Sequence, residues 1–341
     1  MKRFLLVVTC LGFMFAGGSA KAWGEPGHQV IGSIAQQILA QTNPSVAQKV
    51  GQLLGGFDLS QATTWADCAR DVHSTHAGFR YYAGRMTPKV CDNFSDDEKN
   101  GPMVDYVSRN WTQCSYTATE GCLGTYHFAD VAIQRDGYNT KEVGTSDHDI
   151  VSTINMALAV LKNPNAPVSS SPTAPKIVGS REALLLIAHM VGDLHQPLHV
   201  GAVYLDPDGE LTDPDTLRDP DSTATRGGNS ISFGSGNLHA SWDRIPTNID
   251  TVASKEMVGQ AISVPKTAGD ASTWAALWAT DTVRAAKAAF QGLTFSGEGD
   301  EHWQAEASDL AAYRKAEAQL QTQQLIKGGA HLAQILAAAL N

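Results

Sequence analysis

Apolar residues recur along much of this chain at the spacing of a helix that buries one face. In 28–40 they stand at positions 30, 31, 34, 35, 38 and 39, which is a helical period. The same pattern predicts five further helices, at 150–161, 181–196, 272–291, 301–320 and 323–340. Asn163-Pro164 and Pro197 should end the first two of these five, because proline cannot continue a helix.

Two segments break the helical pattern. Proline and serine are frequent in 163–179, which we expect to be a loop. Seven acidic residues and two arginines stand among turn-forming residues in 204–228, which predicts an exposed loop leading to a short hairpin around 229–233. Strand patterns are otherwise scarce, and no linker is visible. The expected fold is mainly α and single-domain, with long loops and one short β-hairpin.

The first 22 residues have the order of a secretory signal peptide. A basic start precedes an apolar run at 4–16, and a small-x-small sequence ends at Ala22. The run is too short to span a bilayer, so a retained membrane anchor is the weaker interpretation. We expect cleavage after Ala22 and export to the periplasm or the medium, which leaves 23–341 as one catalytic domain.

The charge of the chain excludes the usual form of tight duplex binding. The whole sequence has 25 basic and 35 acidic residues, and loss of the three basic residues of 1–22 leaves 22 minus 35, or -13. Duplex-binding proteins normally present a basic stripe. Bound divalent cations would reverse the local charge, so a substrate that carries phosphate is still compatible with this composition.

Four cysteines remain after the leader, and an even number in an exported chain favours disulfide bonds. Four cysteines allow three pairings. We favour Cys114–Cys122, which closes a short loop, together with Cys68–Cys91. The chain contains no Cys-x-x-Cys motif, which argues against a structural zinc knuckle and against a thioredoxin-like site.

Histidine and aspartate occur together at spacings that suit metal binding. His189 and Asp193 are four residues apart in a predicted helix, so both side chains face one side and could bind one ion. His199 follows the helix break and projects from the helix end. His239 and Asp243 repeat the spacing of four. One such pair is weak evidence, since a lone helical histidine is more often structural, but several pairs in an exported chain favour zinc.

The expected cleavage adds a further candidate ligand. A chain that begins at Trp23 has a free α-amine next to a carbonyl oxygen, and His28 follows five residues later. An amine that titrates near neutral pH can bind a metal ion. The site of maturation is therefore expected to form part of the active site.

These motifs together resemble the S1/P1 nucleases, which are zinc-dependent, single-strand-specific nucleases of fungi, plants and bacteria. The resemblance spans residues 23–243, and the motifs follow the order of the family. They are Trp23-Gly24 with His28, Trp65-Ala66-Asp67, His127-Phe128-x-Asp130, Gly192-Asp193-Leu-His-Gln-Pro-Leu-His199, Gly227-Gly228-Asn229 and Asn237-Leu-His239-x-x-Trp242-Asp243. The alanine-rich C-terminal part matches only in its helical character.

The resemblance implies a helical protein that holds three Zn²⁺ ions in a cleft. The first zinc would be bound by Asp67, His127, His189 and Asp193. The second would be bound by His199, His239 and Asp243. The third would be bound by the amine and carbonyl of Trp23, by His28 and by the shared Asp193. Asp193 would then bridge a close pair of ions.

The resemblance also implies an activity and the residues that carry it. A hydroxide generated between the paired zinc ions would attack the phosphate. Asp67 would orient or deprotonate the water that gives this hydroxide. The other zinc would stabilise the departing 3′ oxygen. Arg70 would stabilise the transition-state charge. Phe128 would stack on an unpaired base and Asp130 would bind its edge. Single-stranded DNA and RNA are the expected substrates, and 5′-phosphorylated products and 3′-nucleotidase activity are expected. A monomer is the default expectation, because no pattern in the sequence indicates an oligomer.

Two other interpretations stay open at this point. A zinc-dependent phospholipase C has a related three-metal site and would hydrolyse a headgroup ester, although no basic amphipathic helix for a membrane surface is visible. An exported zinc-storage protein would normally carry histidine-rich tracts, whereas the histidines here are dispersed. We expect His195 to be structural or to support the ligands. The remaining histidines are expected at the surface or as helix caps, and they are His73, His76, His148, His302 and His331.

Overall fold

The computed structural model describes residues 23–84, 87–94, 97–111, 122–165, 169, 171–299 and 302–341. The expected leader at 1–22 and the expected Cys114–Cys122 bond lie outside these residues. Within them, Cys68 and Cys91 form the predicted disulfide bond, which ties the helix that carries Asp67 to a following 3₁₀ turn. No helix in the described ranges is long and apolar enough to cross a membrane.

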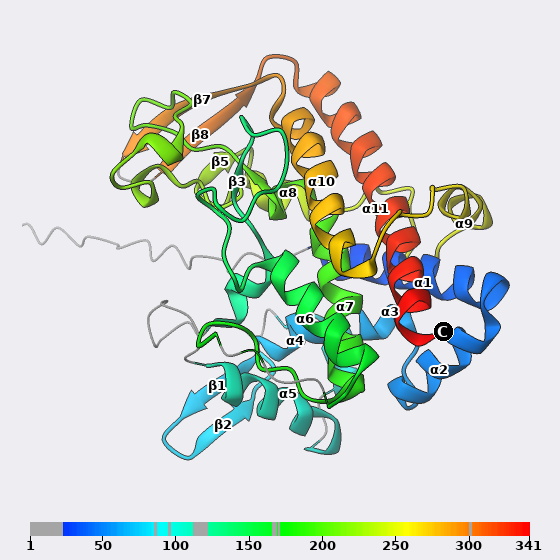
Figure 1. Cartoon of the computed structure of the whole chain (residues 1–341). Coiled ribbons are helices and arrows are strands. Elements are labelled where there is room, and N and C mark those ends of the chain that lie inside the picture. Colours follow the sequence, from blue (N-terminus) through cyan, green and yellow to red (C-terminus); the bar gives the residue numbers. More distant parts are fainter. Residues whose placement is uncertain are drawn as a thin grey trace, which may run out of the picture.

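The fold is mainly helical, as the apolar period predicts. The expected helices at 28–40, 150–161 and 181–196 form as α1 (Glu25–Thr42), α6 (Ile150–Lys162) and α7 (Gly179–Leu194). Every side chain of α7 from Glu182 to Leu194 is buried, which makes α7 the central helix. Figure 1 shows α7 between the sheet at one end of the molecule and the β1–β2 hairpin at the other.

Helices from distant parts of the described chain pack against α7. The other helices are α2 (Pro44–Leu54), α3 (Leu59–Ala62), α4 (Trp65–Ala69), α5 (Asp97–Asn110), α8 (Leu238–Trp242), α9 (Lys255–Ile262), α10 (Trp274–Phe290) and α11 (Leu310–Leu340). The 3₁₀ turns are η1 (Lys89–Phe94), η2 (Cys122–His127), η3 (Pro197–His199), η4 (Pro214–Thr216), η5 (Asp221–Thr223) and η6 (Ala271–Thr273).

The prediction of two helices at 301–320 and 323–340 is wrong. A strand, β8 (His302–Ala307), occupies the start of this region, and α11 then runs without a break from Leu310 to Leu340. Burial alternates at the start of β8, where Trp303 is buried between less buried neighbours. The alanines of β8 favour a helix in a sequence pattern, so pairing with neighbouring strands decides its conformation.

Three small sheets accompany the helices within the described residues. The predicted hairpin is present as β5 (Ile231–Phe233) and β6 (Gly236–Asn237), but it belongs to a larger sheet of order β6-β5-β8-β7, with β7 at Leu293–Gly299. β5 and β8 are parallel, and the other pairs are antiparallel. The remaining sheets are the antiparallel hairpin of β1 (Val72–Thr75) and β2 (Gly78–Tyr81) and the parallel pair of β3 (Val131–Ala132) and β4 (Gly201–Ala202).

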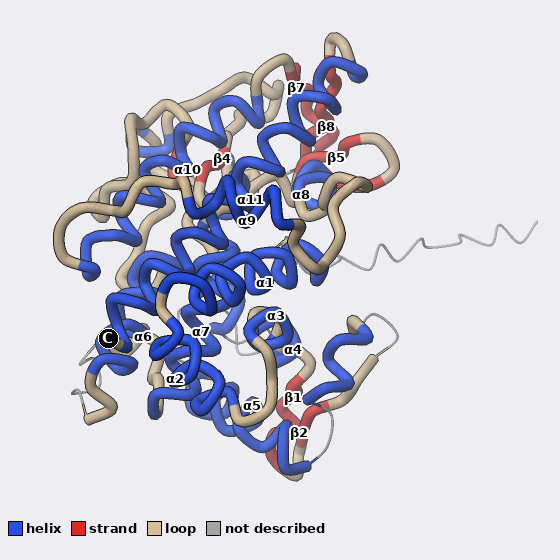
Figure 2. Tube along the Cα trace, turned by 90° about the vertical axis from the view of Figure 1, so that its right-hand side faces the viewer, coloured by secondary structure: helices blue, strands red, loops and turns tan. Residues whose placement is uncertain are grey.

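α1 and α11 pack closely against each other in the core. They lie side by side in Figures 1 and 2 although they are far apart in the sequence. A Cβ atom at Gly329 would lie 2.5 Å from the Cβ atom of Ile34. Only glycine therefore permits this approach, which accounts for Gly329 inside a 31-residue helix.

The acidic segment 204–228 is not uniformly exposed. Its ends are held by buried residues, among them Tyr204 and Thr225, while its acidic middle faces solvent. Arg135 anchors that middle part, because its guanidinium group bonds to the carboxylates of Asp213 and Asp215.

Candidate metal centre

Histidine and aspartate side chains that are buried or nearly buried gather in three groups around the end of α7. The groups are His28 with His189 and Asp193, Asp67 with His127 and His189, and His199 with His239 and Asp243. In each group the nitrogen and oxygen atoms that could bind a cation lie within 4.8 Å of one another. The groups contain every side-chain ligand that the resemblance implies. One detail differs, since His28 lies beside His189 as well as beside Asp193.

Asp193 lies at the middle of this arrangement and is fully buried. Its Oδ1 atom is 3.0 Å from His28 Nε2. Its Oδ2 atom is 2.9 Å from His127 Nδ1 and 3.0 Å from His189 Nε2. Each carboxylate oxygen thus faces different imidazoles, which is the arrangement needed for one carboxylate to serve two cations.

Backbone carbonyl groups fix the orientation of three of the imidazole rings. Nδ1 of His189 is 2.6 Å from the carbonyl oxygen of Thr63, and Nδ1 of His199 is 2.9 Å from that of His127. Nδ1 of His239 is 2.8 Å from the carbonyl oxygen of Gly227. A carbonyl oxygen can only accept, so each Nδ1 carries a proton and each ring directs Nε2 into the centre.

Several polar atoms in the centre are buried and form no hydrogen bond of acceptable geometry with a described residue, although Nε2 of His28 and Oδ1 of Asp193 lie 3.0 Å apart. These atoms are both ring nitrogens of His28, Oδ1 of Asp67 and Oδ1 of Asp193. A buried polar atom without a partner costs about 1–3 kcal/mol. The Nε2 atoms of His199 and His239 also face each other at 3.1 Å. A cation between these atoms would satisfy all of them, and a donor set of imidazole nitrogen and carboxylate oxygen suits zinc. The residues therefore fit bound metal ions.

The charges in the centre agree with this fit except at His189, where burial lowers the pKa but the carboxylates of Asp193 and Asp67 raise it to about 9. Burial lowers the pKa of His127 to about 4 and also lowers the pKa of His28, so both imidazoles are neutral and able to bind a cation. Burial opposes ionisation of Asp193, but the neighbouring histidines hold the pKa of this carboxyl well below its usual value. Burial raises the pKa of Asp243, and Asp67 and Asp193 raise it further. A bound cation would offset this repulsion between carboxylates.

Short elements bring the ligands together from distant parts of the chain. The β3–β4 pair joins the segment after His127 to the segment after His199, and the N–H of Ala129 donates to the carbonyl of His199 at 2.8 Å. Gln196 was not singled out by the sequence, yet its Nε2 donates to Asp243 Oδ1 at 2.8 Å. This bond connects the helix break to the group formed by His199, His239 and Asp243.

The residues expected to contact substrate lie at the edge of the centre. The side chains of Asp67 and Arg70 are 12% and 25% exposed, and Oδ1 of Asp67 is 3.8 Å from Nη1 of Arg70. Phe128 and Asp130 are partly buried. Burial raises the pKa of Asp130 to about 7, although Arg226 and the N–H of Gly227 act in the opposite direction. This carboxyl group can therefore donate as well as accept a hydrogen bond near neutral pH.

Trp23 is completely buried at the start of the described chain. The N–H of the next residue, Gly24, donates to the carbonyl of Asp243 at 2.8 Å. The first residues of the described chain therefore lie against the metal centre, and α1 begins directly after them with His28 in its first turns.

Of the histidines outside the three groups, His331 contradicts the prediction. It is 6% exposed rather than at the surface, and its ring stacks on that of Trp278 with centroids 4.4 Å apart. His195 is buried as expected, with Nδ1 2.7 Å from the carbonyl of Val191 and Nε2 2.7 Å from Nδ1 of His331. The apolar face of 325–336 was the available signal for His331. The exposed histidines are His73, His76 and His302, and His148 is partly exposed.

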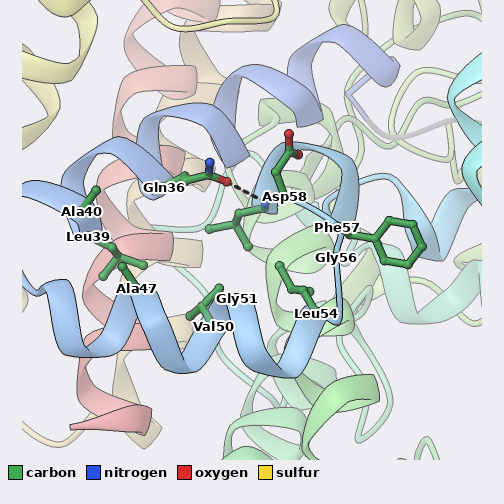
Figure 3. Close-up of a pocket in the computed structure, with 11 residues that line it drawn as sticks. Gln36, Leu39, Ala40, Ala47, Val50, Gly51, Leu54, Gly56, Phe57 and Asp58 are labelled. Carbon is green, nitrogen blue, oxygen red and sulfur yellow. Dashed lines mark hydrogen bonds between the residues drawn. The ribbon is translucent and has the colours of Figure 1, made fainter.

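A surface hollow of about 470 Å³ lies apart from this centre, between α1 and α2. Figure 3 shows its lining, across which Gln36 accepts a hydrogen bond from the N–H of Leu59 at 2.7 Å. None of the three ligand groups lines this hollow. The candidate chemistry is thus carried by the buried polar groups rather than by this hollow.

Gly192 gives a test of how tightly the centre is packed. A Cβ atom at Gly192 would lie 2.8 Å from Nδ1 of His28, so Gly192→Ala should displace His28 from Asp193 and reduce bound metal. Gly51→Ala is the matched control, since nothing lies within 4 Å of that position and the helix should gain about 1 kcal/mol. Metal content and thermal unfolding of both variants would show the difference. Full metal content in Gly192→Ala would refute the close packing.

Comparison with known proteins places the chain in a family. A family model described as S1/P1 Nuclease matches residues 23–121 and 110–341. Endonuclease 2 of Arabidopsis thaliana is 23% identical over 76% of this chain and 66% of its own length, and Endonuclease 1 of the same plant is 24% identical over 71% and 59%. Nuclease S1 of Aspergillus oryzae is 23% identical over 74% and 61%. The chain spans about three fifths to two thirds of these relatives. The match of the family model along the described ligands shows that the chain belongs to the S1/P1 nuclease family.

Proposed function

We propose that this protein is a zinc-dependent nuclease that hydrolyses single-stranded DNA and RNA to 5′-phosphorylated products, with 3′-nucleotidase activity. The observation that carries the proposal is the pair of oxygens of Asp193, which face His28 on one side and His127 and His189 on the other. Family membership and the names of the relatives, which are endonucleases and a nuclease, support the same activity.

Three zinc ions would be held by nine residues of the chain. One ion would be bound by Trp23, His28 and Asp193. A second would be bound by Asp67, His127, His189 and the same Asp193. The last would be bound by His199, His239 and Asp243. Bound zinc would supply Lewis acidity toward the phosphate oxygens and make water a stronger nucleophile at neutral pH. The buried carboxylate of Asp193 holds negative charge where two of these cations would lie.

The chain itself supplies groups for proton and charge transfer. Oδ1 of Asp67 has no hydrogen-bond partner in the described part of the chain, so it is placed to accept a proton from the attacking water. Arg70 lies beside it, and a planar guanidinium can donate to two oxygens of a phosphate as charge develops. Both side chains keep some exposure, which allows a substrate to reach them.

Phe128 and Asp130 would select unpaired bases. An aromatic ring can stack on any base that has been released from a duplex, which favours single strands without a sequence preference. The Asp130 carboxyl would hydrogen-bond the edge of the same base. We further propose that the protein is exported after cleavage at Ala22 and acts as a monomer. The family model begins to match at Trp23, which supports that cleavage site.

The first experiment measures release of 5′-nucleotides from single-stranded DNA and RNA by the processed, zinc-loaded protein. A chelator-treated sample, a duplex of the same sequence and a phosphatidylcholine assay would run in parallel. Chelator-sensitive release from single strands is the expected result. Headgroup release without nucleotide release would instead assign the centre to phospholipid hydrolysis.

Phe128→Ala tests the single-strand preference directly. Loss of a stacked base should raise KM for single-stranded DNA by about 10-fold, because stacking contributes about 1–3 kcal/mol per base. Hydrolysis of bis(p-nitrophenyl) phosphate, which has no base, should change little. Phe295→Ala, on β7, is the control for loss of an aromatic ring elsewhere. Equal losses on both substrates would show that Phe128 supports the fold rather than the base.

A further inference from the structure

The hairpin of β1 and β2 carries one face that is open to solvent. His73 pairs with Arg80 in the register of the hairpin, so these side chains share a face. Tyr82 follows Arg80 by two residues, and its ring centroid is 6.4 Å from that of His73. All three side chains are exposed, and Tyr82 is 50% exposed. We call these three residues the hairpin face.

The opposite side of the hairpin is packed against the protein. Val72 is buried, and the ring of Phe79 contacts that of Trp111, with centroids 5.3 Å apart. β1 and β2 both contact α5 on this side. Packing on one side fixes the hairpin, so the hairpin face is held in position rather than covered.

The charge of the hairpin face is unusual for this chain, whose formal net charge is -10. Arg80 makes no ion pair or hydrogen bond with any residue that the structure describes, whereas Arg109, Arg135 and Arg314 are all paired with carboxylates. None of the paired residues of the hairpin is acidic. A guanidinium without a partner among the described residues, on the same hairpin face as two aromatic rings, suits a ligand that offers both phosphate groups and bases.

The hairpin face continues from the metal centre along the chain. Arg70 ends α4 next to Asp67, and β1 begins two residues later. The N–H of Tyr82 donates to the carbonyl of Asp71 at 2.9 Å, which places Tyr82 beside the residue that follows Arg70. Figures 1 and 2 both show the hairpin directly next to α4, on the side away from the four-stranded sheet.

We propose that the hairpin face binds the part of a single-stranded nucleic acid that lies beyond the scissile phosphate. Tyr82 and His73 stack on successive bases, and Arg80 contacts a phosphate between them. These contacts do not read sequence, so they increase affinity for longer strands of any composition. The proposal rests on the proposed nuclease function and extends its substrate from one nucleotide to a strand of several.

The test compares substrates of different length in the variants Arg80→Ala and Tyr82→Ala. For a 12-nucleotide single strand we expect KM to rise by about 10-fold in each variant with little change in kcat. For a 3′-mononucleotide, which reaches only the metal centre, KM should be unchanged. Arg80→Ala should also reduce the slope of log affinity against log salt by about 0.7, the value for one phosphate contact on a single strand.

Binding measured without turnover separates this proposal from the proposed function. Fluorescence anisotropy with a slowly cleaved phosphorothioate 12-mer and the zinc-loaded protein gives Kd directly, and Arg284→Ala on α10 is the control for loss of an exposed arginine. Thermal unfolding of each variant should match the parent, since the replaced side chains are exposed. Unchanged Kd in Arg80→Ala and Tyr82→Ala would overturn the proposal, even if the parent cleaves DNA. Weakened binding would support it, even if the parent failed to cleave.

Discussion

Replacing Asp193 with asparagine is expected to remove metal from two sites together and to lower kcat/KM by more than about 100-fold. Residues that only orient a metal ligand already contribute about 10- to 100-fold. Asp193 should exceed this, because its two oxygens lie within 3.0 Å of His28 and His189 and both face the centre. An amide has one oxygen in place of two and cannot carry the charge that balances two cations.

Metal analysis of gel-filtered protein measures this effect directly. The parent should hold three zinc ions per chain and Asp193→Asn should hold one. Asp281→Asn removes an exposed carboxylate on α10 and should keep all three. Loss of a single ion from Asp193→Asn would show that the carboxylate serves one site and that the centre contains no bridge.

A chain that keeps residues before Trp23 is expected to lack one zinc ion and most of its activity. Acylation converts the α-amine of Trp23 into an amide nitrogen, which has no lone pair available for a metal. Trp23 is completely buried, and its neighbour Gly24 is bonded to the backbone of Asp243, so the start of the domain cannot easily shift to compensate.

Mass spectrometry of the N-terminus, metal content and kcat should be measured on the same preparations. A tag of equal length at the C-terminus is the control, since Asn341 is exposed. Full metal content and full activity in protein confirmed to carry residues before Trp23 would remove the α-amine from the ligand set.

The parts of the centre that the sequence predicts well are those encoded by local spacing. His189 and Asp193 are one helical turn apart in a stretch of α7, 183–194, that is otherwise apolar, so their shared direction follows from the helical period. The break after them is encoded just as locally by Pro197. The same reasoning places α1 and α6 within a few residues of their observed ends.

The parts that the sequence misses depend on partners that are distant in the chain. β8 pairs with β5, about 70 residues earlier, and this pairing overrides the helical preference of its alanines. His331 contacts His195 at a separation of 136 residues, so neither residue alone indicates a buried pair. The position of the hairpin face beside Arg70 likewise depends on a backbone bond between Tyr82 and Asp71.

Because α1 packs against α11, we expect the metal centre to form only after α11 has folded against α1. His28 lies on α1, and α1 packs against α11. α1 therefore cannot be fully packed until α11 has been synthesised and has folded against it. Contacts between such distant segments form slowly, since a long loop must close first. We therefore expect the ligand groups to remain incomplete while the chain is being made. Zinc would then be acquired late, in the compartment where folding is completed.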